Sequence, residues 1–188
     1  MYRILFLILM LIPLPLNAEG WFLAVGTGGC SYVEKDSSTS GTANVPVGKY
    51  ATRTYSAVSW TTGSAYSCKQ IKFKHAVSGT ITGGNSYAKI WDNNAGEPGN
   101  LLGTSGGIAL TSISDGEQVT YTFSTPISLE NATVYHAGIY VDTVDEVNYI
   151  ELYFDDSGTD DFNYGNDGSS WTNADATSTI WAVTYACE

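Results

Sequence analysis

Strict alternation of apolar and polar residues in the second half of the chain limits its folds more than any other feature. Residues 119–124 read Val-Thr-Tyr-Thr-Phe-Ser, and residues 135–141 read Tyr-His-Ala-Gly-Ile-Tyr-Val. A period of two puts alternate side chains on opposite faces of a strand, so both segments are predicted to be half-buried antiparallel strands. The residues expected to face inward, with those of a third strand at 68–74, are Ile71, Phe73, Val119, Tyr121, Phe123, Tyr135, Ala137, Ile139 and Val141.

Turn-forming residues separate these strands from others. The run Asp-Asn-Asn-Ala-Gly-Glu-Pro-Gly at 92–99 predicts a reversal after a strand that begins near Tyr87. The Ser/Thr/Gly-rich segment 37–48 is expected to be a loop. Further strands are expected at 55–60, 149–154 and 179–185. Many short strands joined by turns predict an all-β chain, built as an antiparallel two-sheet β-sandwich.

The amino terminus has the features of a secretory signal. Arg3 precedes an apolar run at 4–12, and Pro13 and Pro15 follow before the small-residue exit at Ala18. A membrane-spanning helix needs about 20 apolar residues, which is more than this run supplies. We therefore expect cleavage after Ala18, no membrane insertion of the mature chain, and a secreted protein at the surface or in the periplasm of a bacterium.

The rest of the chain has the length of one domain. Removing the predicted signal peptide, residues 1–18, leaves enough chain for one sandwich core but not for two ordinary domains. We expect residues 55–188 to form the sandwich. Residues 19–54 are expected to belong to the same domain, as an amino-terminal strand and loop segment whose packing the sequence leaves open.

The net charge limits the classes of binding partner. The formal net charge is −11, and loss of Arg3 with the signal makes it −12. Such a chain repels phosphate backbones and anionic membrane surfaces, so nucleic acid is disfavoured, and neutral polymers, cations or basic proteins are favoured. The acidity also has a simpler explanation, because a net negative surface keeps an extracellular protein soluble.

The order of three motifs resembles a known family. "YAKIWDNNAGEPGNLLGTS" at 87–105 precedes "VTYTFSTPISL" at 119–129, and "DGSSWT" at 167–172 precedes the last strand. This order, over roughly residues 55–186, resembles the choice-of-anchor β-sandwich domains of secreted bacterial surface proteins. The resemblance implies a jelly-roll-like sandwich, similar to carbohydrate-binding modules, in a family that usually has no assigned ligand. The chain departs from the family in residues 19–54, in its three cysteines and at His136.

Aromatic residues beside amide and acidic residues are the candidate binding residues. Sugar rings stack their C–H faces on Trp and Tyr, while neighbouring polar side chains bond the hydroxyls. One patch contains Trp91, Asn93 and Asn94, and a second contains Tyr164, Asn166 and Trp171. Trp171 has an alternative role as a cap on the sandwich, and Trp60 is expected in the core. If Trp171 binds sugar, Trp171→Ala should weaken binding without lowering stability.

Acidic clusters suggest calcium. The carboxylates of a Gly-rich segment can wrap Ca²⁺ with oxygen ligands, although EF-hand spacing is missing. The residues of this predicted site are Asp155, Asp156, Asp160 and Asp161, with Asp167 nearby. Asp92, Asn94 and Glu97 form a second candidate, but Asp and Asn are also favoured in turns because they bond local backbone groups.

Cysteine usage predicts one disulfide. The chain has three cysteines, Cys30, Cys68 and Cys187, and an oxidising compartment favours pairing. First and last strands commonly neighbour each other in sandwiches, so we favour a bridge between Cys68 and Cys187. The pair of Cys30 and Cys187 remains the alternative, and the leftover thiol is expected to be buried or to pair between molecules.

Catalytic motifs are weak. The chain has only two histidines, His75 and His136, which fall on separate predicted strands and are expected to be exposed; no G-x-S-x-G, H-E-x-x-H or C-x-x-C motif occurs. We therefore predict a non-catalytic secreted module that binds a glycan or cell-surface polymer, with calcium as its one candidate cofactor. The alternatives are a structural subunit of an extracellular assembly, which contacts itself or other surface proteins, and a polysaccharide hydrolase with a carboxylate pair.

Overall fold

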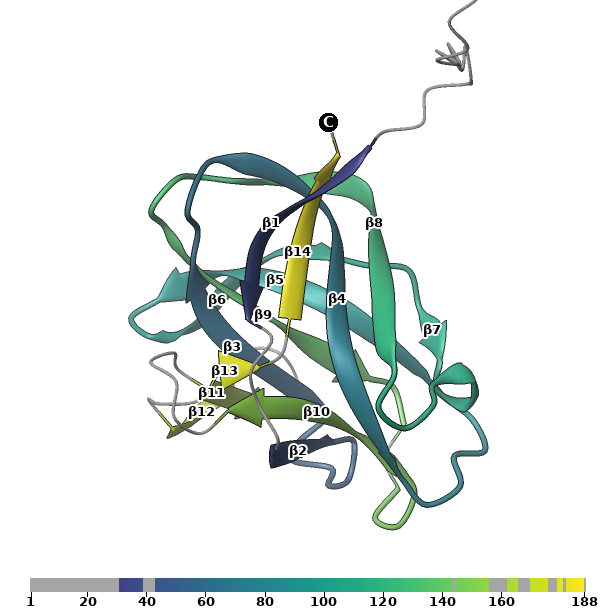
Figure 1. The fold of residues 1–188 in the computed structure, drawn as a ribbon. Coiled ribbons are helices and arrows are strands. Elements are labelled where there is room, and N and C mark those ends of the chain that lie inside the picture. The colour runs from purple at the N-terminus through teal and green to yellow at the C-terminus, as the bar shows by residue number, and fades with distance from the viewer. Residues whose placement is uncertain are drawn as a thin grey trace, which may run out of the picture.

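A computed structural model of the chain describes residues 31–38, 43–143, 145–155, 162–165, 170–175, 179–180 and 182–187. These residues form two antiparallel sheets of seven strands each (Figure 1). Within the described ranges the one helical element is the 3₁₀ turn η1, Leu110–Ser112. No helix in these ranges has the length and apolarity needed to span a membrane. The predicted all-β, two-sheet sandwich is confirmed.

The first sheet, which we call the β4 sheet, has the strand order β1-β14-β4-β10-β13, with β2 paired to β10 and β8 paired to β4. In Figure 1, β1 lies beside β14 near the carboxyl end of the chain. Its strands are β1 (Tyr32–Ser38), β2 (Ala43–Val47), β4 (Tyr66–Ser78), β8 (Gln118–Leu129), β10 (Tyr149–Asp155), β13 (Thr179–Ile180) and β14 (Ala182–Cys187).

The second sheet, which we call the β9 sheet, has the strand order β12-β11-β3-β9-β5-β6, with β7 paired to β5. Its strands are β3 (Tyr55–Thr61), β5 (Asn85–Asn94), β6 (Glu97–Thr104), β7 (Ile108–Ala109), β9 (Val134–Val141), β11 (Phe162–Gly165) and β12 (Trp171–Asp175).

The chain path through eight of these strands is that of a jelly roll. One sheet contains the order β2-β10-β4-β8 and the other contains β3-β9-β5-β6. The chain changes sheet at every connection among these strands except the β5–β6 hairpin, so strands next to each other in sequence mostly face each other across the core. This is the double Greek key of jelly-roll sandwiches. The other six strands extend the two sheets.

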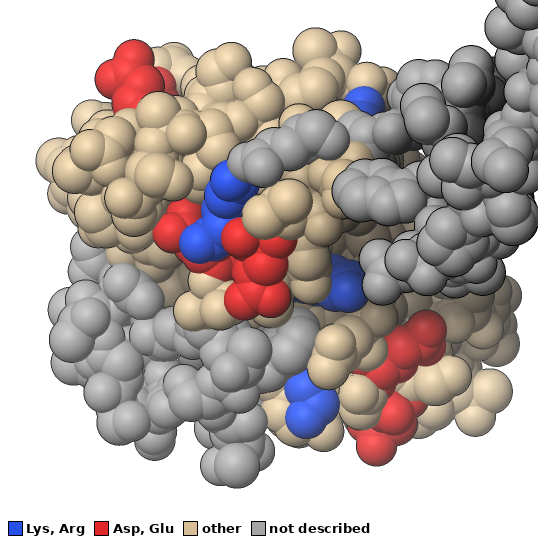
Figure 2. Space-filling model, turned by 45° about the horizontal axis from the view of Figure 1, so that its top comes forward, with Lys and Arg blue, Asp and Glu red and all other residues tan. Residues whose placement is uncertain are grey.

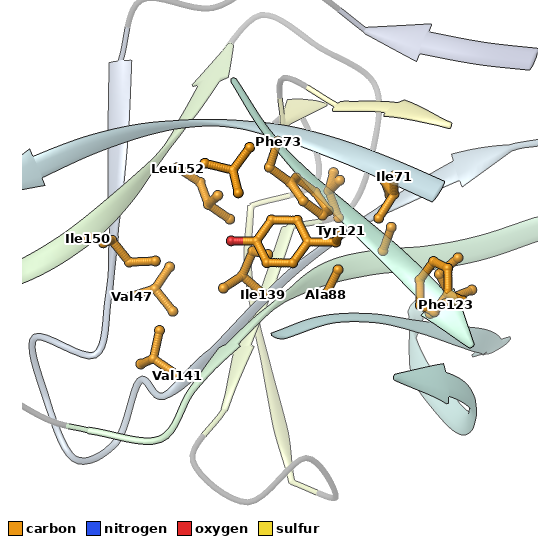
Figure 3. Close-up of a cluster of buried hydrophobic side chains, with 14 of the residues drawn as sticks. Val47, Ile71, Phe73, Ala88, Tyr121, Phe123, Ile139, Val141, Ile150 and Leu152 are labelled. Atoms are coloured by element: carbon orange, nitrogen blue, oxygen red, sulfur yellow. The ribbon is translucent and has the colours of Figure 1, made fainter. Parts of the chain in front are cut away.

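The core lies between the sheets and follows the predicted alternation. All nine residues expected to face inward are buried in one apolar cluster. Figure 3 shows Tyr121 in the middle of that cluster, near Phe73, Ala88 and Ile139. Trp60, also expected in the core, is partly buried and packs against the same cluster, with its ring 5.7 Å from that of Tyr135.

A polar chain crosses this interior. The Tyr121 hydroxyl lies 3.1 Å from His75 Nε2 and 2.8 Å from Ser86 Oγ. His75 is fully buried, so the expectation that it is exposed is wrong. It follows Ile71 and Phe73 on the inward face of β4. The Tyr121 hydroxyl pairs with its Nε2, while its Nδ1 has no partner among the described residues. Burial lowers the pKa of His75 to about 3.

The segment expected to be a loop contains a strand. β2 pairs with β10, and its alternate residues Val45 and Val47 are buried in the core. Pro46 between them is compatible with an edge strand, because proline cannot donate to a second neighbour. The flanking Ser, Thr and Gly residues hid this short alternation in the sequence. The described part of the amino-terminal segment therefore contributes to the sandwich, while residues 19–30 lie outside the described ranges.

The favoured disulfide is wrong. Cys68 is a free, fully buried cysteine within the core cluster. In the register of β4 and β14, Cys68 lies opposite Ala186, and successive side chains on a strand point to opposite faces. Cys187 is therefore directed away from Cys68, and it lies opposite Tyr32 of β1 instead. The alternative pair includes Cys30, which lies outside the described residues.

Candidate functional site

The outer face of the β9 sheet carries a second apolar cluster, separate from the core. Register explains it: Tyr55 of β3, Tyr140 of β9 and Tyr87 of β5 lie opposite one another in one row across three strands. Their strand neighbours Ile139 and Ala88 face the core, so the tyrosines face outward. We call the following residues the aromatic cluster: Tyr55, Tyr87, Trp91, Tyr140 and Trp171.

Rings in the aromatic cluster contact one another continuously. The Trp91 and Trp171 ring centroids are 5.2 Å apart at 80°, and the Trp171 and Tyr55 centroids are 5.9 Å apart at 79°, both edge-to-face arrangements. Tyr140 stacks between Tyr55, at 4.5 Å, and Tyr87, at 5.8 Å. Trp91 and Tyr55 are buried, whereas Tyr87, Tyr140 and Trp171 are partly exposed. The cluster therefore presents three aromatic side chains to solvent above two that form its base.

Small residues make this arrangement possible. Ala57 and Gly138 lie opposite each other in the row beside the tyrosines. A Cβ atom at Gly138 would lie 2.0 Å from the Ser56 carbonyl oxygen and 2.6 Å from Ala57 Cα. Both of these are backbone atoms that cannot move aside, so only glycine fits at this position. The short side chains leave space above the strands that the large rings fill.

Two polar atoms in or beside the aromatic cluster lack hydrogen-bond partners in the part of the chain that the structure describes. Asn163 of β11 is fully buried and donates from Nδ2 to the Gly96 carbonyl at 3.2 Å, but its Oδ1 has no partner. The indole Nε1 of Trp171 is also buried without a partner. Each such atom costs about 1–3 kcal/mol, which makes unpaired groups rare in native folds. Two of them beside one aromatic cluster indicate an incomplete set of contacts.

One ammonium group lies among the rings. Lys89 Nζ is 3.5 Å from the Tyr55 hydroxyl, 5.0 Å from the Tyr55 ring centroid and 4.8 Å from the Tyr140 ring centroid. These distances fit cation–π contacts with both rings. Burial lowers the pKa of Lys89. The site thus combines aromatic faces with a partly desolvated positive charge.

A carboxylate borders the cluster at the end occupied by Tyr87. Asp142 accepts hydrogen bonds from Asn85, at 2.7 Å from the backbone nitrogen and 3.0 Å from Nδ2, and lies 3.5 Å from the Tyr87 hydroxyl. Desolvation raises the pKa of Asp142, but these hydrogen bonds outweigh it and the pKa is lowered. Asp142 is therefore ionised at neutral pH and fixes the orientation of the Tyr87 hydroxyl.

The structure joins residues that the sequence placed in two patches. Trp91 and Trp171 were expected in separate patches, yet they are in contact because β12 extends the same sheet through β11. Asn93 is used inside the β5–β6 turn, where its Oδ1 accepts from the Gly96 nitrogen at 3.1 Å and lies 3.0 Å from His136 Nε2. Asn94 is exposed at the tip of that hairpin, away from the rings.

Other predicted binding residues fall outside what is described. The Tyr164 backbone lies in β11, but its side chain is not described, and Asn166 lies outside the described residues. The sequence interpretation missed Tyr55, Tyr87 and Tyr140. A signal for them exists, because the outward positions of three predicted strands carry aromatic residues where a solvent-facing strand normally carries polar ones.

The calcium predictions have different outcomes. At the second candidate, the Asp92 carboxylate accepts from the Asn100 backbone nitrogen at 2.5 Å and from Asn100 Nδ2 at 2.9 Å, which is the turn-stabilising role. Within the described ranges no group of three His, Cys, Asp or Glu residues could hold a metal ion. Asp155 ends β10, while the other residues of the first candidate, Asp156, Asp160 and Asp161, lie outside those ranges.

The two histidines lie in different parts of the molecule. His75 faces the interior from β4, whereas His136 faces outward from β9, opposite Trp91 of β5. His136 is nevertheless fully buried, so the expectation of exposure is wrong for it too. Its place beside the large Trp91 ring explains the burial. The imidazoles are therefore parts of two separate polar networks.

The described residues define a class: a two-sheet antiparallel β-sandwich with jelly-roll connectivity and an aromatic cluster on the outer face of one sheet. No protein-family model matches the chain, and no curated protein matches it either.

Proposed function

We propose that the protein is a secreted, non-catalytic module that binds carbohydrate through the aromatic cluster of the β9 sheet. The observation that carries the proposal is the continuous contact of five aromatic rings on an outward face, beside two polar atoms without partners. The proposed binding surface differs from the loop patches expected from the sequence, because the rings lie on strands.

The chemistry of the cluster suits sugars. Sugar rings present apolar C–H faces to aromatic rings and hydroxyls to polar groups. The partly exposed ring of Tyr87, at the end of the tyrosine stack, offers the apolar contact, and Asp142 offers a hydrogen-bond acceptor at the border. Asn163 Oδ1 and Trp171 Nε1 are covered, so a sugar hydroxyl would complete their hydrogen bonds only after the side chains around them move.

The proposal also includes secretion of the protein and its resemblance to a family. The apolar amino-terminal run supports secretion, and the motif order resembles the choice-of-anchor domains, whose jelly-roll shape is shared by carbohydrate-binding modules. Calcium at Asp155, Asp156, Asp160 and Asp161 is proposed as a structural ion that would hold the segment before β11. Chelation should then lower the melting temperature, and an unchanged melting temperature would contradict the calcium site.

A polysaccharide panel tests the binding proposal. Wild-type protein should bind at least one glycan class by calorimetry, and Tyr87→Ala should weaken that binding at least tenfold, because it removes an exposed ring and the partner of Asp142. The matched control is Tyr153→Ala, which removes a partly exposed tyrosine from the outer face of the β4 sheet. Equal losses in the two variants, or no binding by a folded sample, would contradict the proposal.

A structural role in an extracellular assembly is the second candidate. The edge strand β1 exposes Tyr32 and Val33, and the edge strand β6 exposes Leu101 and Leu102. Exposed apolar residues on edge strands favour pairing with another chain. This role predicts concentration-dependent association in sedimentation experiments, which Val33→Lys and Leu101→Lys should abolish; a monomer at all concentrations would contradict it.

A further inference from the structure

Lys89 gives the aromatic cluster a charge that sugar stacking alone does not need. Its ammonium lies 3.5 Å from the Tyr55 hydroxyl, and it is within cation–π distance of both the Tyr55 and the Tyr140 ring. An ammonium has three N–H donors, and a single phenol oxygen at the long end of hydrogen-bonding distance can accept only one of them. Donors therefore remain for another group.

No carboxylate neutralises this ammonium within the part of the chain that the structure describes. The arrangement is unusual for a chain with 19 acidic residues and 8 basic ones, where an acidic neighbour is easily found. Burial disfavours the charged form of Lys89, and the pKa is lowered accordingly. An anionic ligand would stabilise the charged form of Lys89, which burial disfavours, because opposite charges attract more strongly where water is excluded.

Lys89 itself provides the access to the ammonium. Ala57, Gly138 and Lys89 lie side by side in the same row of the sheet. Ala57 and Gly138 are buried beneath the rings, whereas the Lys89 side chain is partly exposed. A substituent on a sugar that contacts the exposed part of the cluster can therefore approach Lys89 from the solvent side.

We propose that the aromatic cluster selects acidic sugars, whose rings carry a carboxylate or a sulfate ester, and that Lys89 recognises the anionic group. This inference rests on the proposed carbohydrate-binding function. Lysine is a compact charge without the planar fork of arginine, so it accepts either anion and does not by itself distinguish them.

The net charge of the protein does not exclude such a ligand. Fields from distant carboxylates are screened over about 8 Å at physiological ionic strength, whereas direct contact with Lys89 acts over hydrogen-bonding distance. Asp142, at the Tyr87 end of the cluster, is exposed to solvent, where its charge is screened. A direct contact between an anionic group and Lys89 is therefore compatible with an acidic molecule.

Three oligosaccharides of similar length test the inference in the secreted chain: oligogalacturonate, sulfated galactan and neutral galactan. Calorimetry at physiological ionic strength should show at least tenfold tighter binding of one or both acidic probes. Lys89→Gln should remove that preference, lowering the affinity for the acidic probe at least tenfold more than the affinity for neutral galactan. Lys89→Arg should retain most of the preference, because the charge remains. The acidic probe that loses affinity identifies the anion.

Lys72→Gln is the matched control. Lys72 lies on the β4 sheet with its Nζ 4.9 Å from the Tyr185 ring, so its substitution changes the net charge equally and also removes a cation–π contact. It should leave the preference unchanged. Equal affinity of the wild type for all three probes, or equal effects of the two Gln variants, would overturn the role of Lys89 while sugar binding stands. No binding to any probe or glycan by folded protein would overturn both.

Discussion

The outer faces of the two sheets use the same residue types in different ways. On the β4 sheet, Lys72 Nζ lies 4.9 Å from the Tyr185 ring, and Lys74 Nζ lies 4.2 Å from the Tyr153 ring. Each of these two tyrosines has its own lysine, and no ring contact joins the two pairs within the described residues. Figure 2 shows basic and acidic side chains close together on one face of the molecule, without a large patch of a single sign.

On the β9 sheet the rings contact one another instead, and Lys89 lies over two of them. The difference arises from what lies between the rings. Gly138 and Ala57 bring β9 and β3 close together, so large side chains from neighbouring rows can meet above them. The tyrosine and lysine content of a face therefore does not by itself identify a binding site. The small residues that allow the rings to contact one another do identify it.

The largest expected effect comes from filling that space. Gly138→Val should destabilise the protein by about 3 kcal/mol or more, because its Cβ would collide with the β3 backbone and separate the strands. Urea denaturation measures the loss. Gly106→Ala is the control, since a Cβ there meets nothing within 4 Å, and it should change stability by less than about 0.5 kcal/mol. Similar losses in both variants would contradict the close approach of β3 and β9.

Acid should weaken the interior that supports both faces. The pKa of His75 falls from 6.5 to about 3 on folding because of burial, so between these values the unfolded chain binds more protons. Stability should therefore be full above pH 6.5 and should fall by up to about 1.4 kcal/mol per pH unit as the pH drops toward 3. Denaturant-induced unfolding of the wild type and of His75→Leu, each at several pH values, measures this contribution. An equally steep loss in the variant would assign the acid sensitivity to other groups.

Removing one aromatic side chain should have a smaller effect on stability, and the size of the loss should differ between the outer faces of the two sheets. Trp171→Ala should lower stability by about 1–3 kcal/mol, because it deletes edge-to-face contacts with Tyr55 and Trp91, each worth about 0.5–1.5 kcal/mol. The structure thus replaces the expectation of an unchanged stability. Tyr153→Ala on the β4 sheet should cost less, since its ring lies apart from the others. A larger loss for Tyr153→Ala in thermal unfolding would reverse the comparison.

The smallest expected effect on stability concerns the separate lysine–tyrosine pairs of the β4 sheet. A double-mutant cycle of Lys74→Met and Tyr153→Leu should give a coupling of about 0.5–1 kcal/mol, typical of an exposed cation–π contact. Each β4-sheet pair should couple independently of the next one. Coupling between Lys72 and Tyr153 of similar size would show that these pairs form a network, as the rings of the β9 sheet do.

Sequence patterns predicted the fold better than the site. Alternation placed Tyr121, Phe123 and Ile139 correctly in the core, because a half-buried strand must follow the pleat. The same alternation also directs His75 inward, but exposure was expected from the polarity of histidine, and the Tyr121 hydroxyl beside it comes from another strand. The disulfide prediction for Cys68 failed because neither the neighbour nor the register of a strand is encoded locally.

The candidate site was predicted only in fragments. Trp91 and Trp171 were recognised as binding residues, but their contact spans strands far apart in the chain and passes through β3 and β11. No local spacing encodes such a contact. Lys89 gave no signal at all, since a lysine on a strand is ordinarily solvated, and only the positions of Tyr55 and Tyr140 give it a role.

The sequence by itself determined the strongly alternating strands, their buried faces and the sandwich class, because a period of two is a local property of each strand. Tertiary structure alone decided which strands are neighbours and in what register. Five rings from four strands form one cluster because hydrogen-bond pairing aligns Tyr87, Tyr140 and Tyr55 in a row and small residues let the tryptophans meet beside it. Such pairing depends on contacts distant in the chain, and it made this face a candidate site.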